Sequence, residues 1–434
     1  MIKRRDFIKW AGAAGIGLNA TGWSMLAQAD SVASPVAIPV PTNTGIKGRV
    51  VVIGGGMGGA TVAKFLRIWG GTGVDVTLIE RDSTYASNIM SNLVLNGSRT
   101  MSSLQYGYGN LASRYGVKIV KGDVVSIDKA TRNVTLASGA SYACDRLVIA
   151  PGIDFDFPPG LETAAAQAKV PHAWKAGPQT TALRNMITAM PAGGVFVMSI
   201  PGKPYRCPPG PYERACIVAD WLKVNRPGSK VIVLDANPGI TAEVHAFTEG
   251  FALHGIDYRP NTTVLGVDTT TMTLQTNAGN IQGNVLNVIP THRAGKVITA
   301  NGLANTADGR WTTVNVLSYE STTAPGIHVI GDASATTQPK AGHIANQEAK
   351  VCADAILRLF SGRALDPSPH TNSACYSPIT ATTASWLTAN FRYDAATQTM
   401  VPVAASSGEA AARSTKNFEE MGKWFTALMG DSFA

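Results

Sequence analysis

Short apolar runs alternate along the chain with stretches in which apolar residues recur at helical spacing. The first apolar run is Val50–Ile53, a helical stretch covers Ala60–Trp69, and the apolar run VDVTLIE then ends at Glu80. The same strand–turn–helix order returns at Val195–Ile200 and Tyr212–Leu222. Strands that alternate with helices in this way are typical of parallel sheets covered by helices. The pattern predicts an α/β fold with two strand–turn–helix units.

A glycine-rich turn joins the first predicted strand to its helix. Gly54, Gly56 and Gly59 form the pattern G-x-G-x-x-G, and Glu80 follows 21 residues after the last of them. Glycines at these positions let the backbone approach a pyrophosphate at the helix N-terminus, and the acid accepts hydrogen bonds from ribose hydroxyls. The turn therefore predicts a dinucleotide site, without distinguishing FAD from NAD.

Later segments favour FAD and predict the fold of the FAD/NAD-linked reductases, with two dinucleotide-binding (Rossmann-like) domains. Asp332, in APGIHVIGDAS, ends an apolar strand where flavoproteins with two dinucleotide domains place a carboxylate on the ribityl chain. Gly152, in CDRLVIAPG, lies in a segment that resembles the turn that re-crosses near the flavin, and Val124 lies in one that resembles the segment packed on the adenine. We expect Lys340 and Gly342 to border the flavin pyrimidine ring, with a purely structural loop role as the alternative.

The turn of the second unit departs from the glycine pattern. Residues 201–211 read PGKPYRCPPGP, and five of these eleven residues are prolines. Proline has no N–H to offer a phosphate, and it stiffens the loop. A pyridine-nucleotide site of the usual kind is therefore not expected there.

Cys207 lies in this proline-rich loop, just ahead of a predicted helix. The helix N-terminus, together with Lys203, Arg206 and Arg214, is expected to stabilise a thiolate and to lower the pKa of Cys207. Glu213 lies in the first turn of the helix, where it is either a helix-terminal acid or a proton acceptor that faces the flavin. The sequence predicts a redox role for the cysteine and leaves both roles open for the glutamate.

The N-terminus combines a basic cluster with a mildly apolar stretch. Lys3, Arg4 and Arg5 precede an Ala/Gly-rich segment that ends in AQA at Ala29. This order is typical of a twin-arginine export signal with a small-residue cleavage site, and the stretch is short and mild for the alternative, a membrane anchor. Cleavage after Ala29 would leave the chain only mildly basic. The signal predicts a periplasmic protein.

The formal net charge of +8 carries little further information. No basic run or RNA-binding signature accompanies it, so nucleic acid is not an expected partner. The seven histidines show no metal-ligand spacing, and no metal site is predicted.

From about Lys47 to Phe433, the chain resembles the flavoprotein subunit of flavocytochrome c sulfide dehydrogenase. The resemblance rests on the twin-arginine start, the glycine turn, IGDAS, CYS at 375–377 and, most specifically, CPPGPYER at 207–214. It implies an FAD enzyme that oxidises sulfide to sulfur or polysulfide. It also implies a redox-active Cys207–Cys375 disulfide beside the flavin, with Glu213 as an acid/base residue and a c-type cytochrome subunit as the electron acceptor.

One stretch departs from the family pattern. Some members bind FAD covalently through a cysteine shortly before an SN pair. Here the stretch reads STYASNIMSN, and when Ser91-Asn92 is taken as that pair, Asn88 occupies the place of the cysteine. We therefore expect FAD to be held non-covalently. The other cysteines, Cys144, Cys216 and Cys352, lie in apolar contexts that indicate packing.

The electron acceptor has two alternatives, and NAD(P)H remains an alternative electron donor. The chain has no C-x-x-C-H motif for its own haem, so electrons would leave to a separate cytochrome or, as in sulfide:quinone oxidoreductases, to a membrane quinone. An NAD(P)H-dependent flavin disulfide reductase is the less favoured class. The apolar stripe at 418–428 is either a membrane contact or, as we favour, a packed helix.

The predicted organisation has three folded parts after an N-terminal extension. The expected boundaries are a signal peptide at 1–29, a flexible linker at 30–46, an FAD domain at 47–158 and 286–362, a second α/β domain at 159–285 and a C-terminal interface domain at 363–434.

Overall fold

The computed structural model describes residues 38–434, which belong to one compact unit. The predicted signal peptide, its cleavage site and residues 30–37 of the predicted linker lie outside the described residues. The described part of that linker runs along the loop at 70–73, where the Thr72 N–H donates to the Pro41 carbonyl over 2.9 Å.

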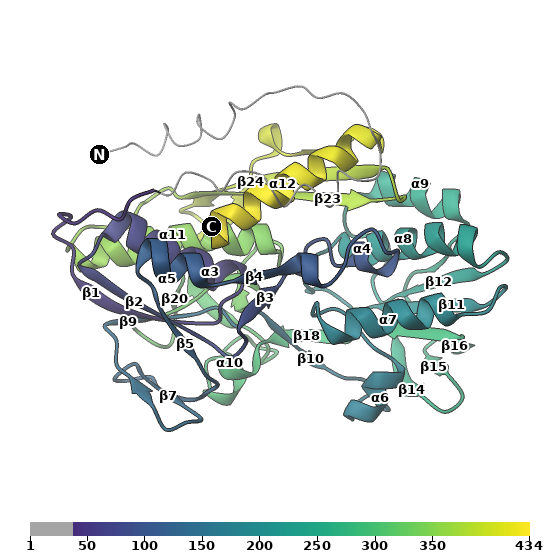
Figure 1. Cartoon of the computed structure of the whole chain (residues 1–434), viewed down its shortest axis with the longest axis horizontal. Coiled ribbons are helices and arrows are strands. Elements are labelled where there is room, and N and C mark those ends of the chain that lie inside the picture. Colours follow the sequence, from purple (N-terminus) through teal and green to yellow (C-terminus); the bar gives the residue numbers. More distant parts are fainter. Residues whose placement is uncertain (1–37) are drawn as a thin grey trace. The chain divides into compact units, whose positions relative to one another are not determined.

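An eight-stranded sheet forms the larger half of the fold (Figure 1). Its strands lie in the order β22-β19-β20-β21-β9-β1-β2-β5, and the five from β21 to β5 are parallel. Their bounds are β1 (Gly48–Ile53), β2 (Val74–Glu80), β5 (Lys118–Lys121), β9 (Arg146–Ile149), β19 (Thr312–Asn315), β20 (Glu320–Ser321), β21 (Ile327–Val329) and β22 (Ser334–Ala335). Two helices, α3 (Met57–Gly70) and α11 (Gly342–Phe360), pack together against this sheet.

A second, four-stranded parallel sheet lies in the other half, in the order β13-β12-β11-β17. Its strands are β11 (Val195–Ile200), β12 (Lys230–Asp235), β13 (Asp257–Arg259) and β17 (Val285–Val288), and its helices are α7 (Pro178–Ala189), α8 (Gly210–Asn225) and α9 (Val244–His254). The chain passes between the halves along β10 (Ile153–Asp156) and returns along β18 (Thr291–Ala294), and these two strands pair antiparallel.

Helix α8 is buried on nearly every side over its first ten residues. Gly210 to Ala219 are all buried, including the charged Glu213 and Arg214. A surface helix has one apolar stripe, and a helix enclosed on all sides belongs to the interior of a protein. The start of α8 therefore lies where the two halves meet, and its two charged residues need internal partners.

An antiparallel sheet and a long helix complete the fold. The sheet contains β23 (His370–Pro378), β24 (Ala384–Asp394), β25 (Thr399–Pro402) and β26 (Gly408–Glu409). Helix α12 (Thr415–Phe433) contacts α3 and β24, and its apolar residues Met421, Phe425 and Leu428 are buried in the core. The preferred interpretation of the C-terminal stripe, a packed helix, is confirmed. Among the described residues, no helix is long and apolar enough to cross a membrane.

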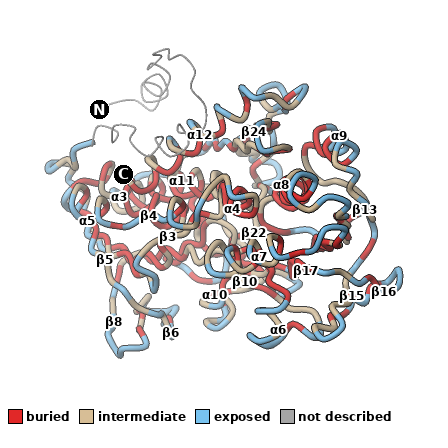
Figure 2. The backbone as a smooth tube through the Cα atoms, turned by 45° about the vertical axis from the view of Figure 1, so that its right-hand side comes forward, coloured by how far each residue is buried: buried red, intermediate tan, exposed pale blue. Residues whose placement is uncertain are grey.

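The shorter elements lie around these layers, and the exposed hairpins stand out in Figure 2. They are β3 (Thr84–Ala86), α4 (Asn92–Leu95), β4 (Gln105–Gly107), α5 (Gly109–Tyr115), β6 (Val124–Asp128), β7 (Asn133–Leu136), β8 (Ser141–Tyr142), α6 (Ala164–Lys169), β14 (Val264–Asp268), β15 (Thr273–Thr276), β16 (Gly279–Gln282) and α10 (Lys296–Ala300).

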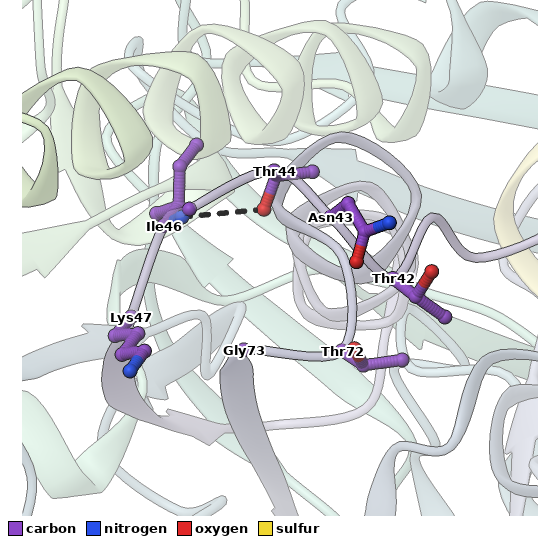
Figure 3. Close-up of a pocket in the computed structure, with 8 residues that line it drawn as sticks. Thr42, Asn43, Thr44, Ile46, Lys47, Thr72 and Gly73 are labelled. Carbon is purple, nitrogen blue, oxygen red and sulfur yellow. Dashed lines mark hydrogen bonds between the residues drawn. The ribbon is translucent and has the colours of Figure 1, made fainter.

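The hollow drawn in Figure 3 is not the cofactor site. Residues 42–47 and 72–73 line it, at the end of the sheet where β1 and β2 begin. Ligands of parallel sheets bind at the opposite end, outside the carboxyl ends of the strands. The candidate site therefore lies beyond Ile53, where the glycine turn follows β1.

Candidate functional site

The glycine turn has the close backbone contacts that a pyrophosphate cradle requires. Gly54 has a φ of +96°, and a Cβ there would lie 2.4 Å from the Ala150 carbonyl oxygen. A Cβ at Gly59 would lie 1.7 Å from the Gly54 carbonyl oxygen, because α3 crosses the turn closely. Gly56 is the N-cap of α3 and has no side-chain acceptor, so no N-cap side chain binds the first N–H groups of the helix, as is usual for anion sites at helix N-termini.

Glu80 lies at the end of β2 beside this turn. Its carboxylate accepts hydrogen bonds from the Gly55 N–H over 2.6 Å and from the Asp82 N–H over 3.0 Å. Its carbonyl accepts from the Gly122 N–H, which brings the segment leading to Val124 next to the same turn. The predicted ribose acid and the predicted adenine segment are therefore adjacent.

Asp332 follows β21 at the other edge of the site. Its Oδ1 is buried without a hydrogen-bond partner among the described residues. Burial raises the pKa of this carboxyl, and the charges of Arg206 and Lys340 act in the opposite direction. A buried acceptor that lacks a donor fits a ligand hydroxyl such as that of a ribityl chain. Together with the glycine cradle, this unpartnered oxygen makes the donor and acceptor set suitable for FAD.

Gly152 and Gly342 lie near the same edge. Gly152 has a φ of +68° with open space around its Cβ position, and its carbonyl accepts from the Gly295 N–H over 2.9 Å. Gly342 begins α11, and a Cβ there would lie 3.1 Å from the side chain of Ile89. Gly152 therefore lies in a turn that needs a positive φ, and Gly342 lies where chain segments approach closely. The contact of both glycines with a flavin stays a prediction.

Lys340 joins the two halves of the site through its backbone. Its carbonyl accepts a 2.7 Å hydrogen bond from the Cys207 N–H. Its ammonium group donates to the Asp332 and Ser334 carbonyls, both over 2.8 Å, and lies 3.8 Å from the centre of the Trp311 ring. The segment that follows Asp332 thus positions the proline-rich loop.

The proline-rich loop between β11 and α8 is held through its backbone. The Lys203 N–H donates to Asn237 over 3.1 Å, and the Arg206 N–H donates to His292 over 2.9 Å. The Trp174 indole donates to the Arg206 carbonyl over 3.2 Å. Since its prolines have no N–H, the loop has few donors left for a phosphate.

The predicted effect of the loop on Cys207 is wrong in direction. Burial and the charge of Glu213 raise the pKa of the Cys207 thiol to about 12, and Arg206 offsets only part of this shift. Lys203 is exposed, and the Arg214 guanidinium is engaged elsewhere. Desolvation therefore outweighs the helix N-terminus and the neighbouring cations, and the resting cysteine is a thiol rather than a stabilised thiolate.

Glu213 lies one turn after Gly210 on α8, and Cys207 precedes this helix by three residues. A Cβ at Gly210 would lie 2.8 Å from the Cys207 sulfur, so the sulfur sits against the face of α8 that also carries Glu213. The Glu213 carboxylate accepts from the Asn92 amide over 2.9 Å, and burial raises its pKa to about 8. It can therefore hold a proton at neutral pH beside the sulfur, which favours a proton-transfer role over a helix-terminal one.

Arg214 is a fully buried cation with five polar contacts in the core. Its guanidinium stacks 4.6 Å from the centre of the Trp174 ring, and burial lowers its pKa to about 9. It donates to the Asn92 Oδ1, the Asn287 Oδ1 and the carbonyls of His172 and Ala173. The fifth contact is the electrostatic one with Glu213. Arg214 therefore anchors the start of α8, and Asn92 connects it to Glu213.

Cys375 reaches the site from β23. The Ala374 N–H donates to the His343 ring over 2.9 Å, which ties this strand to the start of α11. Burial raises the pKa of Cys375 well above its usual value, and the charges of Cys207, Glu243 and Glu213 raise it further. The two cysteines of the resemblance are thus electrostatic neighbours, although they are 168 residues apart in the sequence.

All five cysteines are free thiols in this structure. Cys207 and Cys375 are half-buried, whereas Cys144, Cys216 and Cys352 are buried in the core, as expected of packing residues. Among the described residues, no cluster of potential metal ligands is found. The pairing of Cys207 with Cys375 stays a prediction.

The sequence does not reveal the roles of four residues of the site. Asn92 belongs to the SN pair, and Arg214 is one of the cations expected near the sulfur, but its contacts in the core have no sequence signal. Glu243 and Ser377 hydrogen-bond to each other beside Cys375. The sequence signal for Asn92 was present in the SN pair, whereas no motif surrounds Glu243.

Three regions of the chain match protein families. Residues 48–184 match the pyridine nucleotide-disulphide oxidoreductases. Residues 180–290 match the central region of the sulfide dehydrogenase (flavocytochrome c) flavoprotein chain, and residues 367–433 match the flavin-binding region of flavocytochrome c sulphide dehydrogenase. The chain belongs to the flavocytochrome c sulfide dehydrogenase flavoprotein family. The chain contains the domains of this FAD-dependent flavoprotein family. The glycine turn and Asp332 are suited to bind FAD as the cofactor.

Individual relatives support the fold of this family. The sulfide:quinone oxidoreductase of Aquifex aeolicus superimposes with a TM-score of 0.71 at 19% identity, over 88% of this chain and 92% of that one. An NAD-dependent persulfide reductase from A. fulgidus superimposes with a TM-score of 0.59 at 14% identity, over 87% and 77%. These likenesses confirm the predicted fold class.

A curated sequence relative matches over a shorter stretch. Ferroptosis suppressor protein 1 of Taeniopygia guttata is 30% identical over 112 residues, which is 25% of this chain and 28% of that protein. The match thus spans less than a third of that relative's length.

Proposed function

We propose that the protein oxidises sulfide to sulfur or polysulfide through a Cys207–Cys375 disulfide and FAD, and that a c-type cytochrome subunit receives the electrons. The observation that carries this proposal is the convergence of two half-buried cysteines and a protonatable Glu213 next to the segment at 332–340. Two neighbouring cysteines with a carboxyl group such as Glu213 beside them can carry out thiol–disulfide exchange with a sulfur nucleophile.

The charges around the two sulfurs assign them different roles. The charge of Arg206 favours the approach of an anion to the Cys207 sulfur, although the charge of Glu213 acts in the opposite direction there. We therefore place the attack of hydrosulfide at the Cys207 sulfur, and the sulfur–sulfur bond breaks with the electron pair going to Cys375. The charges of Glu243 and Glu213 disfavour negative charge at Cys375, so the departing sulfur needs a proton. Cys207 becomes a persulfide, and Cys375 leaves as a thiolate. FAD, when bound, supplies an acceptor for an electron pair that can release electrons singly.

Asn88 supports non-covalent binding of FAD. Its Oδ1 accepts hydrogen bonds from the Ala176 N–H over 2.7 Å and from the Arg206 guanidinium over 3.2 Å. The side chain at this position thus ties the segment at 84–92 to the proline-rich loop and offers no thiol. Acid precipitation of the protein should release all of its FAD into the supernatant, and yellow pellets would contradict this prediction.

The second dinucleotide fold argues against NAD(P)H as the electron donor. Asp235 ends β12, where such folds place the ribose acid, but it is fully buried. Its carboxylate accepts from the hydroxyls of Tyr212, over 2.7 Å, and Tyr258, over 2.8 Å, and from the Asn237 amide, over 2.7 Å. These side chains occupy the hydrogen-bonding capacity that a ribose would need.

The burial of α12 favours a cytochrome over a membrane quinone. The apolar stripe that would be a membrane contact is packed on α3 and β24. We also propose that the protein acts in the periplasm after twin-arginine export, on the strength of the N-terminal sequence alone. Cell fractionation with Arg4→Lys and Arg5→Lys together should move the protein from the periplasm to the cytoplasm.

The test is anaerobic addition of sulfide to the purified protein while the flavin absorbance is recorded. Rapid bleaching that Cys207→Ser abolishes, and that cytochrome c but not a soluble quinone reverses, is the expected result. Reversal by quinone alone would assign the protein to the quinone-dependent alternative. Bleaching by NADH instead of sulfide would contradict the proposal altogether.

A further inference from the structure

Glu243 is a second buried carboxyl in the site, at a conformation that glutamate rarely adopts. It precedes α9 with φ +48° and ψ 47°, in the left-handed region, and only 2% of its surface is exposed. Both the backbone strain and the burial of a carboxyl destabilise the fold. Strained residues of this kind persist where the surrounding structure holds them, and they cluster at functional sites.

The Glu243 carboxyl is held against the strand that carries Cys375. The Ser377 hydroxyl donates a hydrogen bond to Oε2, whereas Oε1 is buried without a partner among the described residues. Ser377 and Cys375 are two residues apart on β23, and side chains at that spacing point to the same face of a strand. The unpartnered oxygen therefore lies on the cysteine side of β23.

Burial of Glu243 favours its protonated form and outweighs the hydroxyls of Ser377 and Ser385, which favour the carboxylate. Glu243 faces Ser377 and Cys375 on β23, Ser385 on β24, Glu213 on α8 and Glu409 on β26. Burial raises its pKa to about 7, and the charge of Glu409 contributes. Near neutral pH, Glu243 therefore carries a proton for part of the time.

We propose that Glu243 is the proton donor and acceptor for Cys375, and that Ser377 positions its carboxyl. The proposal rests on the proposed function and adds a step to it. When hydrosulfide opens the disulfide, the Cys375 thiolate takes the proton from Oε1 of Glu243. The products are the Cys207 persulfide, the Cys375 thiol and the Glu243 carboxylate. The carboxylate takes the proton back when Cys375 gives up its electron pair to FAD, the electron acceptor of the proposed function.

This assignment gives each sulfur its own carboxyl group. Glu213 lies on the face of α8 against which the Cys207 sulfur sits, and Glu243 is held by Ser377 on the strand of Cys375. A separate donor for Cys375 is needed because the acids around it make a lasting thiolate unfavourable. Without a proton from Glu243, the leaving sulfur would more readily re-form the disulfide.

The first experiment compares Glu243→Gln with Glu249→Gln. Glutamine keeps an acceptor for Ser377 but holds no titratable proton, and Glu249 is an exposed acid on the same helix, α9. Flavin reduction by sulfide is followed by stopped flow from pH 6 to pH 9. Taking the ratio of wild-type to variant rates cancels the ionisation of sulfide itself.

The ratio for Glu243→Gln should be roughly 100 at pH 6 and should fall towards one as the pH rises through about 7. Glu249→Gln should give a ratio near one throughout. Ser377→Ala should slow the reaction roughly tenfold while the pH dependence remains. A ratio for Glu243→Gln that does not change with pH would overturn the proposal, because a purely structural role has no titration.

A second measurement does not depend on sulfide. In a Cys207→Ser background, the alkylation rate of Cys375 is measured against pH, and the modified residue is located by mass spectrometry. Removing the Glu243 charge should lower the pH at which Cys375 becomes reactive, and an unchanged profile would overturn the proposal. If the profile shifts but sulfide bleaches no flavin in the wild-type protein, the coupling of Glu243 to Cys375 stands and the proposed function fails.

Discussion

The sulfur of Cys207 lies so close to Gly210 that no side chain can be added there. A Cβ at Gly210 would lie 2.8 Å from the sulfur and 3.0 Å from the ring of Trp174. The glycine is therefore a steric requirement of the redox cysteine, apart from any effect of glycine on the helix itself.

Gly210→Ala should slow flavin reduction by sulfide at least tenfold, because the sulfur must move from its place against α8. Gly202→Ala is the matched control, since a Cβ in that part of the loop meets no atom within 4 Å. Stopped-flow reduction of both variants, with FAD content measured beside it, checks the prediction. Equal rates in the two variants would show that the position of the sulfur is not critical.

The raised pKa of Glu213 predicts a pH-dependent stability. Its pKa rises from 4.5 in the unfolded chain to about 8 in the folded protein, so the folded state binds more protons between these values. The wild-type protein should therefore lose stability relative to Glu213→Gln as the pH rises from 5 to 8, by on the order of 3 kcal/mol. Urea unfolding at both pH values tests this, and a constant difference would be inconsistent with a buried acid.

Weakening the hydrogen bonds to Asp235 should lower the stability of the protein without enabling NADH to reduce the flavin. Tyr258→Phe removes one of the hydroxyl donors to a buried carboxylate, which should cost about 1–3 kcal/mol in the free energy of unfolding. NADH should still not reduce the flavin, because Tyr212 and Asn237 remain bound to Asp235. The matched control is Tyr142→Phe on β8, a half-buried tyrosine outside the Asp235 cluster, where little change is expected. Reduction of the Tyr258 variant by NADH would contradict the blocked-site interpretation.

Asp332 is expected to matter for FAD retention. Asp332→Ala removes the unpartnered acceptor and should raise the dissociation constant of FAD by roughly tenfold or more, because a hydrogen bond to a charged group is lost. Titration of the apoprotein with FAD measures this directly and needs no activity. Asp308→Ala provides a control acid whose partners, Thr306 and Arg310, lie in its own turn.

Local motifs predicted most of the fold and part of the site. The strand Val195–Ile200 has the bounds expected from its apolar run, and the glycine turn lies where its spacing placed it. Cys207 and Glu213 could be recognised because they share one short motif. Contacts between distant segments, such as Asn92 with Glu213 across 121 residues, leave no spacing to detect.

The pKa of Cys207 shows a second reason why the sequence alone could not predict the whole site. The cations beside it are visible in the sequence, but the burial that outweighs them depends on how α8, β23 and the segment at 340 assemble. Glu243 was missed for a related reason. Its left-handed conformation and its hydrogen bond to Ser377 exist only once β23 has packed against the start of α9.

The saturated Asp235 carboxylate also has an evolutionary consequence. A lineage that gained the use of a nicotinamide cofactor at this site would have to replace Tyr212, Tyr258 and Asn237 and rebuild a loop rich in prolines. Each replacement alone leaves a buried charge with fewer donors, and so lowers stability before any affinity for the nucleotide can appear. Intermediate sequences would be selected against, so these contacts act as an evolutionary barrier to the recruitment of a nicotinamide cofactor.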